Sequence, residues 1–361
     1  MTGILNRYLI RQYAIWIVIV TGGFGVIATL GDFLEMLRFA NRFELGAGAA
    51  FLFTLQRLPL LLLDLLPFVF LFAAVFCLLR LSQAQELAVI RAAGLSVWQF
   101  LKPLLAFTFL LATFIVCVIE PVGVHYHARF TETQNALTKK SPQLSVTAGG
   151  VWFRENSDKG NYFIRADKLD PNNGSVLIKA DVSVMDAEGD FSHRLSAEKA
   201  TLKEGRFELA NVRQFGGGAD ETVIPVVSLP TQLKVDNLQA GFKPPRAVSI
   251  WQLPLYIAEA GAAGIDVSRH QARFQSLLAL PTLLLAMVMV AACFSLPTGR
   301  MFSTGQTLGL SVICGFFLFL FNDFIGLMGE LNILPAILAG WMPAIIALLL
   351  SVSYLLSTED G

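Results

Sequence analysis

Charged and apolar side chains alternate at helical spacing in one short segment, residues 81–103, with the sequence LSQAQELAVIRAAGLSVWQFLKP. Its apolar residues recur on one helical face, at Leu87, Ile90 and Ala93. Glu86 and Arg91 fall on other faces, and Gly94 follows as a helix stop. A half-polar helix of this kind either lies on a membrane surface or presents a docking face to a separate protein, such as an ATPase. The pattern leaves both alternatives open.

The histidines are further candidates for chemistry. His125 and His127 are two residues apart, so on a helix they point to different faces, and no third metal ligand stands near them. His193 and His270 are isolated and are interpreted as surface or interfacial residues. The sequence lacks phosphate-loop, nucleophile-elbow and zinc-protease patterns (GxxxxGKS or GxxxxGKT, GxSxG and HExxH). The chain is therefore expected to hold no metal or cofactor and not to be an enzyme.

Two carboxylates lie inside apolar runs, at Asp64 and Asp323. A charge within a membrane span is costly, so such residues commonly face a cavity or a partner. Each is expected near the outer end of its helix, where it can also reach the interface or form a local hydrogen bond. The sequence leaves their roles open.

Composition places the chain in a bilayer. Its 361 residues are 55% hydrophobic and have a mean hydropathy of +0.61, above the roughly one-half apolar content of soluble domains. The formal net charge of 0 gives no general attraction to nucleic acid. The four cysteines all lie in apolar runs and are expected to be core residues rather than disulfides or metal ligands: Cys77, Cys117, Cys293 and Cys314.

Six apolar runs fit membrane helices, at about 1.5 Å per residue across roughly 30 Å of hydrocarbon. They are 12–31, 58–79, a shorter run at 103–119, 274–299, 301–322 and 331–358. The first lacks a cleavage site and is interpreted as a retained span. Basic residues on the terminal side are Arg7, Arg11, Arg80, Arg91, Lys102 and Arg300, against Arg38, Arg42 and Arg57 in the first loop. Because positive residues favour the cytoplasm, both termini are predicted to be cytoplasmic and the polar insert periplasmic.

The insert between the third and fourth runs has the signals of an antiparallel β-module. Short segments with partial alternation, rich in Val, Ile and Phe, are VWFREN, NYFIRADKL, SVLIKADVSVMD, HRLSAEKATL and RFELANVRQF. Turn residues separate them at 158–160, 171–174, 188–190, 204–205 and 216–218. This spacing favours a sandwich or jelly-roll.

The expected organisation is therefore six transmembrane helices, three before and three after an inserted jelly-roll domain. The first part, 1–124, holds three spans and a cytoplasmic helix at about 82–95. The second, 125–248, is the β-domain with a helical lead-in at 122–137 that extends the third span. The third, 249–361, begins with a short helix at 250–260 and contains the last three spans.

Several segments together resemble one family across essentially the whole chain. They are LNRYLIRQY, DFLEMLR and QELAVIRAAGLS, combined with the three-plus-three arrangement and the β-insert. The chain is similar to the LptF/LptG permease subunits of the lipopolysaccharide-transport ABC exporter. GDFLEMLR, the following residues 45–48 and FNDFIG are closer to the LptG branch.

The resemblance implies a set of partners. A second, LptF-like permease subunit would pair with this chain on a dimer of an LptB-like ATPase, which would bind the ATP and magnesium. LptC and LptA-like proteins would form a periplasmic bridge that receives lipopolysaccharide from the jelly-roll. Spans one and five would form gates in a Gram-negative inner membrane. The family's contacts to the ATPase map onto Glu86, Leu87, Ile90, Arg91 and Gly94.

Lipopolysaccharide contacts are expected in an apolar cavity and at its outer rim. Some relatives carry a lysine near the outer end of the first span, where this chain has Asp32, and two arginines after the third span, where Arg129 is followed by Glu132. The candidates are Asp32, Arg38, Arg42, Arg129, Phe317, Phe321 and Asp323. Ordinary interfacial anchoring remains the alternative for the arginines, and lipid exposure for the phenylalanines. Gly305 and Gly309 are expected to let the fifth helix approach a neighbour.

Two other functions stay open. One is the LptF subunit, or another ABC permease for lipids or lipoproteins. The other is a membrane-anchored enzyme or scaffold whose β-domain performs the function, although the insert lacks a cluster of acid, base or metal-binding residues.

Overall fold

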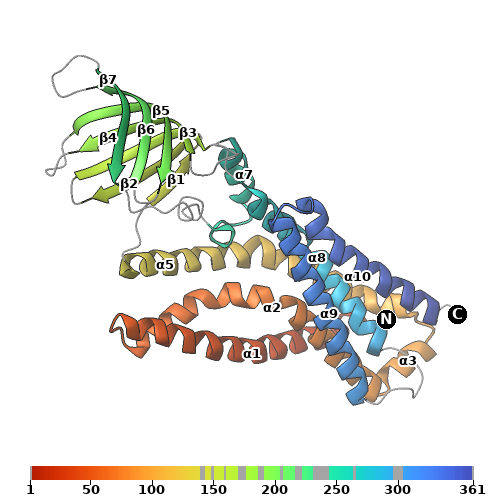
Figure 1. The fold of residues 1–361 in the computed structure, drawn as a ribbon. Helices are drawn as coiled ribbons and strands as arrows, with labels where there is room; N and C mark the ends of the chain where they lie inside the picture. Colours follow the sequence, from red (N-terminus) through yellow and green to blue (C-terminus); the bar gives the residue numbers. More distant parts are fainter. Residues whose placement is uncertain are drawn as a thin grey trace. The chain divides into compact units, whose positions relative to one another are not determined.

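The computed structural model describes residues 2–138, 143–147, 150–157, 160–169, 176–185, 191–203, 206–215, 222–230, 244–262, 266–295 and 304–359. They divide into two compact units (Figure 1). The first unit is made of residues 1–130 and 271–361, and the second of residues 131–270. The chain passes between the units twice, and each unit is described separately.

The first unit is a bundle of long helices, six of which have the length and apolarity to cross a membrane. Three precede the insert: α1 (Thr2–Arg42), α2 (Ala47–Gln83) and a continuous third helix formed by α4 (Val97–Phe114), η1 (Ile115–Ile119) and α5 (Glu120–Thr138). Three follow it: α8 (Ser268–Ser295), α9 (Thr304–Glu330) and α10 (Ala336–Glu359). The predicted three-plus-three arrangement is confirmed, as is the helical extension of the third span.

The third helix is longer than its apolar run, because it continues through a local distortion. Residues Ile115–Ile119 form a π-helical turn just before Pro121. Proline has no N–H, and its ring crowds the carbonyl four residues earlier, so an α-helix cannot pass it unchanged. The widened turn accommodates that conflict within one helix.

The first two helices also exceed their apolar runs. With 41 and 37 residues, α1 and α2 are each more than about 50 Å long, against roughly 30 Å of hydrocarbon. Residues 32–42 and 47–57 therefore form a charged helical hairpin at one end of the bundle. The short link between them turns at Glu44, whose φ is 56°.

Close helix contacts define the bundle interior. On α1, one face packs inward at Leu9, Tyr13, Ile17 and Val20. The Thr108 hydroxyl of α4 donates to the Tyr13 hydroxyl at 3.3 Å. At Gly315, α9 lies so close to α2 that a Cβ atom would overlap the Leu71 side chain. The predicted approach at Gly305 and Gly309 is not seen within this chain, since an added Cβ meets nothing within 4 Å at either residue.

Replacing Gly315 by valine is expected to lower the free energy of unfolding by about 1–3 kcal/mol, because the added methyl groups force α9 away from α2. The measurement is thermal unfolding in mild detergent. Gly309→Val is the matched control on the same helix, with open space around it. Equal stability losses in the two variants would contradict a close contact at Gly315.

The second unit is built on one antiparallel sheet whose described strands follow one another in chain order, β1 to β7. The five predicted segments are confirmed as β2 (Gly150–Ser157), β3 (Gly160–Leu169), β4 (Val176–Met185), β5 (Phe191–Lys203) and β6 (Arg206–Phe215). Two edge strands were missed, β1 (Gln143–Thr147) and β7 (Thr222–Pro230). The predicted turns, apart from Gly160 at the start of β3, lie outside the described residues. The predicted antiparallel β-domain is confirmed. The described strands form one sheet in the order of an up-and-down meander around one buried cluster, and the strand crossing of a sandwich or jelly-roll is not seen among them.

A crease crosses the sheet and lets its long strands enclose that core. Buried residues in β4 change from odd to even positions after Leu177, and those in β6 change in the same way after Leu209. The strands make this change at Lys179 and Asn211, both with φ 53°. Across the sheet, Asn211 Nδ2 donates to Glu198 Oε2 at 3.1 Å. Because side chains alternate faces along a strand, an aligned irregularity of this kind directs both halves of each strand to the same core.

Candidate functional site

The segment 84–96 forms a separate short helix with defined ends. Helix α3 (Glu86–Ala92) follows Gln85, which has a φ of 59°. It ends at Gly94, with a φ of 80°, and the Leu95 N–H donates to the Ile90 carbonyl at 3.4 Å. This is a Schellman ending, for which glycine is favoured because it adopts positive φ without strain. The predicted helix stop at Gly94 is confirmed, whereas residues 81–83 belong to α2.

The apolar residues of α3 attach it to the bundle. Leu87 and Ile90 are partly buried against the hydrophobic core of the helix bundle. They therefore attach the helix to the bundle, and their predicted contacts to an ATPase stay predictions. Val89 points outward and is 68% exposed. The side chain of Arg91 lies outside what the structure describes, so its predicted contact stays a prediction.

Glu86 is tied to the first helix. Its Oε1 accepts a hydrogen bond of 3.1 Å from the hydroxyl of Tyr8. Glu86 is half-buried at the first turn of α3, and Tyr8 is exposed. Sequence reasoning missed Tyr8, although the segment LNRYLIRQY that contains it was noted. The carboxylate is therefore held in place by a residue 78 positions earlier in the chain.

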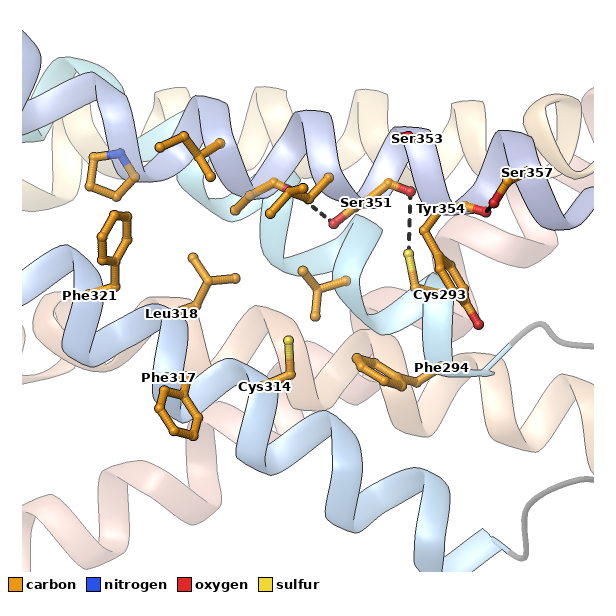
Figure 2. Close-up of a pocket in the computed structure, with 15 residues that line it drawn as sticks. Cys293, Phe294, Cys314, Phe317, Leu318, Phe321, Ser351, Ser353, Tyr354 and Ser357 are labelled. Atoms are coloured by element: carbon orange, nitrogen blue, oxygen red, sulfur yellow. Dashed lines mark hydrogen bonds between the residues drawn. The ribbon is translucent and has the colours of Figure 1, made fainter.

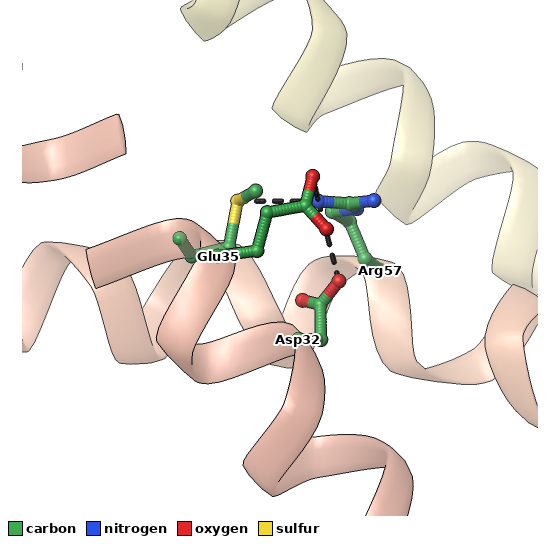
Figure 3. A network of polar contacts seen from close by, with 4 residues as sticks. Asp32, Glu35 and Arg57 are labelled. Carbon is green, nitrogen blue, oxygen red and sulfur yellow. Dashed lines mark hydrogen bonds and ion pairs between the residues drawn. The ribbon is translucent and has the colours of Figure 1, made fainter. Parts of the chain in front are cut away.

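The charged hairpin contains a buried ion pair. Asp32 Oδ1 lies 3.2 Å from Arg57 Nη1, and the Asp32 side chain is only 4% exposed (Figure 3). The same nitrogen is 3.5 Å from Glu35 Oε1. The guanidinium lies over the ring of Phe130, with 5.4 Å to the ring centroid. Arg57 thus joins α1, α2 and α5 at this end of the bundle.

This geometry changes the expectation for Asp32. The residue was predicted at a lipopolysaccharide-contacting position, but its observed partner is Arg57, which sequence reasoning had treated only as a topology signal. The sequence signal that could have identified this ion pair is an acidic residue at the end of one span and a basic residue at the start of the next. Arg38, Arg42 and Arg129 are exposed at the same end and remain the predicted polar contacts.

The two intramembrane aspartates lie at one level of the bundle. Helices α2 and α9 meet at Leu71 with Gly315 and at Phe68 with Phe319, whose rings are 4.8 Å apart. Extending this antiparallel register by one turn brings Asp64 level with Asp323. Both are exposed within this chain. Since α2 begins at Ala47, Asp64 lies near the middle of its helix rather than near its end.

Phe317 and Phe321 line a cavity of about 810 Å³ between α8, α9 and α10 (Figure 2). They are 68% and 37% exposed, and the Phe321 ring points towards α10 whereas the Phe317 ring points away from it. The hydroxyl-bearing residues of the cavity all come from α10. The structure therefore does not group these two phenylalanines with the charged hairpin.

Burial differs strongly among the six spans. Within the most apolar stretch of each, 67% of α8 and 56% of α2 are buried, against 11% of α1 and 17% of α9. The bare face of α1 carries exposed aliphatic residues along its length, including Val18, Val26, Ile27 and Leu30. Within the described part of the chain, few residues of the first and fifth spans are therefore fully buried.

Comparison with known proteins agrees with this arrangement. The family model described as "Lipopolysaccharide export system permease LptF/LptG" matches residues 7–357. The chain is 22% identical to the lipopolysaccharide export system permease protein LptG of Haemophilus influenzae, over 99% of each chain. It is 23% identical to the protein of that name from Escherichia coli K12, over 97% of each chain. The chain therefore belongs to the LptF/LptG family, and its similarity favours the LptG branch.

Proposed function

We propose that the chain is the LptG-type subunit of an ABC exporter that extracts lipopolysaccharide from the outer leaflet of the inner membrane, driven by a separate ATPase. Family membership itself makes the chain a multi-pass inner-membrane permease subunit of a lipopolysaccharide export system that acts with other Lpt components. The side of the membrane on which each end lies, the ATPase partner and the periplasmic transfer are the proposed parts. Positive residues near the termini support cytoplasmic ends and a periplasmic β-domain.

The observation that carries the proposal is the uneven burial of the spans. A subunit that encloses a lipid path together with a partner must leave part of its apolar surface uncovered, and α1 and α9 do so. The charged hairpin, with exposed Arg38 and Arg42, adds polar groups only beyond the apolar part of α1.

The free-energy cost of extracting a lipid explains why an ATPase is needed. Removing acyl chains from a bilayer costs about 0.8 kcal/mol for each CH₂ exposed to water. The sequence has no nucleotide-binding motif. Energy must then enter from a partner, and α3 suits its docking because it is short, anchored by Leu87 and Ile90, and presents Val89 outward.

Among the described strands, β7 forms an edge of the sheet that suits transfer to a second β-domain. Strand β7 pairs with β6 alone among the described strands, and it exposes Val223 and Val226 by 66% and 61%. An unpaired strand edge is a common docking site for another sheet. Such pairing would continue the apolar core into LptC or LptA-like bridge proteins.

The test is affinity purification in mild detergent, with mass spectrometry of the proteins and lipids that copurify. We expect an ABC ATPase, a second six-span subunit and lipopolysaccharide. Recovery of the chain alone with ordinary phospholipid would contradict the proposal and favour an anchored β-domain scaffold.

Charge reversal at Arg38 is expected to weaken photocrosslinking to lipopolysaccharide by about tenfold, because a cation facing phosphate or carboxylate groups becomes an anion. Arg80→Glu provides the control, since Arg80 is exposed near the opposite end of α2. Unchanged crosslinking in Arg38→Glu would assign Arg38 to membrane anchoring only.

A further inference from the structure

The cavity between α8, α9 and α10 extends towards the α3 end of the bundle, whereas the charged residues proposed to contact lipopolysaccharide lie at the hairpin end. The antiparallel register of α2 and α9 places Glu330 at the hairpin end of the bundle, so α10 starts there and runs to the end that carries α3. The cavity extends along α10 from Pro343 to Ser357. Because the charged hairpin lies at the other end of the bundle, it cannot supply polar contacts to a ligand in the cavity.

Helix geometry creates the cavity. A Cβ atom on Gly329 would lie 2.5 Å from the Cβ of Ala339, so α9 and α10 are in close contact near their connecting turn. From there α9 runs obliquely away from α10 (Figure 2). Helix α8 covers the back of the gap with Val290, Cys293 and Phe294. The result is a wedge that widens towards the α3 end and opens to the surrounding hydrocarbon.

The wedge has an apolar wall and one polar end. Its wall hydroxyl, Ser351, donates to the Ala347 carbonyl at 2.7 Å and so offers no unused donor. The Ser351 carbonyl in turn accepts from Cys293 Sγ at 3.4 Å. Towards the end of α10, Ser353, Tyr354 and Ser357 are exposed. The Ser357 hydroxyl donates to the Tyr354 carbonyl at 2.9 Å and so offers a ligand its acceptor lone pairs. A ligand here must be hydrocarbon along most of its length and polar at one end.

The dimensions fit a lipid chain. Pro343 and Ser357 are separated by about 21 Å of helix, which covers the roughly 15 Å depth of one leaflet's hydrocarbon and reaches about 6 Å beyond it. The volume of about 810 Å³ is within the range of sites for small ligands. Because the medium around these spans is itself lipid, an acyl chain can enter the wedge sideways without leaving the membrane.

We infer that the wedge between α9 and α10 is a binding site for a glycerophospholipid of the leaflet on the α3 side, with one acyl chain between Leu318 and Ile346 and its headgroup beside Tyr354 and Ser357. Identification of that leaflet as cytoplasmic rests on the proposed orientation. The bound lipid supports α9 where it has separated from α10. It thereby fixes the tilt of a span in which few residues are fully buried.

The test uses the assembled complex in nanodiscs that contain phosphatidylethanolamine with a photoreactive group near the end of one acyl chain. We expect crosslinks on the cavity-facing residues of 314–321 and 343–357. Ala347→Phe fills the buried wall and should reduce these crosslinks by roughly tenfold. Leu349→Phe is the matched control, because Leu349 is 62% exposed and does not line the cavity.

A second variant changes an exposed residue and leaves the buried core of the helix bundle unaltered. Ser353→Phe narrows the exposed end of the wedge and should also reduce crosslinking, with normal copurification of the complex. Unchanged crosslinking in both cavity variants would overturn the inference. So would native mass spectrometry showing lipopolysaccharide, rather than phospholipid, displaced by them. Failure of the complex to assemble in the wild type would instead contradict the proposed function.

Discussion

Replacing Glu86 with alanine is expected to leave the chain inserted in the membrane but to weaken its association with the ATPase by at least about thirtyfold. Loss of one member of an interfacial charged contact costs roughly 2–5 kcal/mol. The effect should be large because Glu86 is held at the first turn of α3 by Tyr8 and cannot easily be replaced by a neighbouring side chain. Copurification of the ATPase and lipopolysaccharide release from proteoliposomes measure the two consequences.

Tyr8→Phe tests how the position of the Glu86 carboxylate matters while its charge is kept. It removes the 3.1 Å hydrogen bond and keeps the carboxylate, so a smaller loss than in Glu86→Ala is expected. Normal ATPase binding together with normal transport in Glu86→Ala would remove the coupling role from α3. Equal defects in the two variants would show that positioning by Tyr8 accounts for the whole contribution of Glu86.

Removal of Arg57 is expected to give the largest loss of stability. In Arg57→Ala, the Asp32 carboxylate, 4% exposed, loses the guanidinium 3.2 Å away. An uncompensated buried charge costs about 3–5 kcal/mol, and the contact with Phe130 is lost as well. Thermal unfolding in detergent should show the change directly.

Two comparison variants distinguish the ion pair from general surface charge. Asp32→Asn combined with Arg57→Gln removes both charges and should recover much of the lost stability, because neither partner is left ionised alone. Arg38→Ala, at an exposed position on the same hairpin, should change the free energy of unfolding by less than about 0.5 kcal/mol. Similar destabilisation in Arg38→Ala and Arg57→Ala would argue against a specific pair.

The elements with simple periodicity were predictable from the sequence. Six spans follow from long apolar runs, and five strands follow from alternation between turns. Strands β1 and β7 were missed because an edge strand has less buried alternation, and β7 contains Pro225. The full lengths of α1 and α2 were missed because apolarity marks the part of a helix in hydrocarbon, whereas hydrogen bonding continues beyond it.

The candidate site was less predictable than the fold, because it depends on contacts between residues that are distant in the sequence. Gly94 could be identified as a helix stop because its requirement is local, namely a positive φ. The pairing of Asp32 with Arg57 and of Glu86 with Tyr8 requires the relative rotation of packed helices, which hydropathy does not specify. Phe317 and Phe321 were predicted to line an apolar cavity, but hydropathy could not specify which neighbouring helices complete the cavity that they line, namely α8 and α10.

The bare faces of α1 and α9 also affect the energetics of movement. Aliphatic side chains have almost the same solvation free energy against lipid tails as against another apolar helix. A seam along either helix can therefore open towards the bilayer with little solvation cost, whereas separation of α2 from α9 at Gly315 would disrupt close packing. The chain thus combines a rigid interior with two surfaces at which a protein neighbour and a lipid molecule are nearly interchangeable.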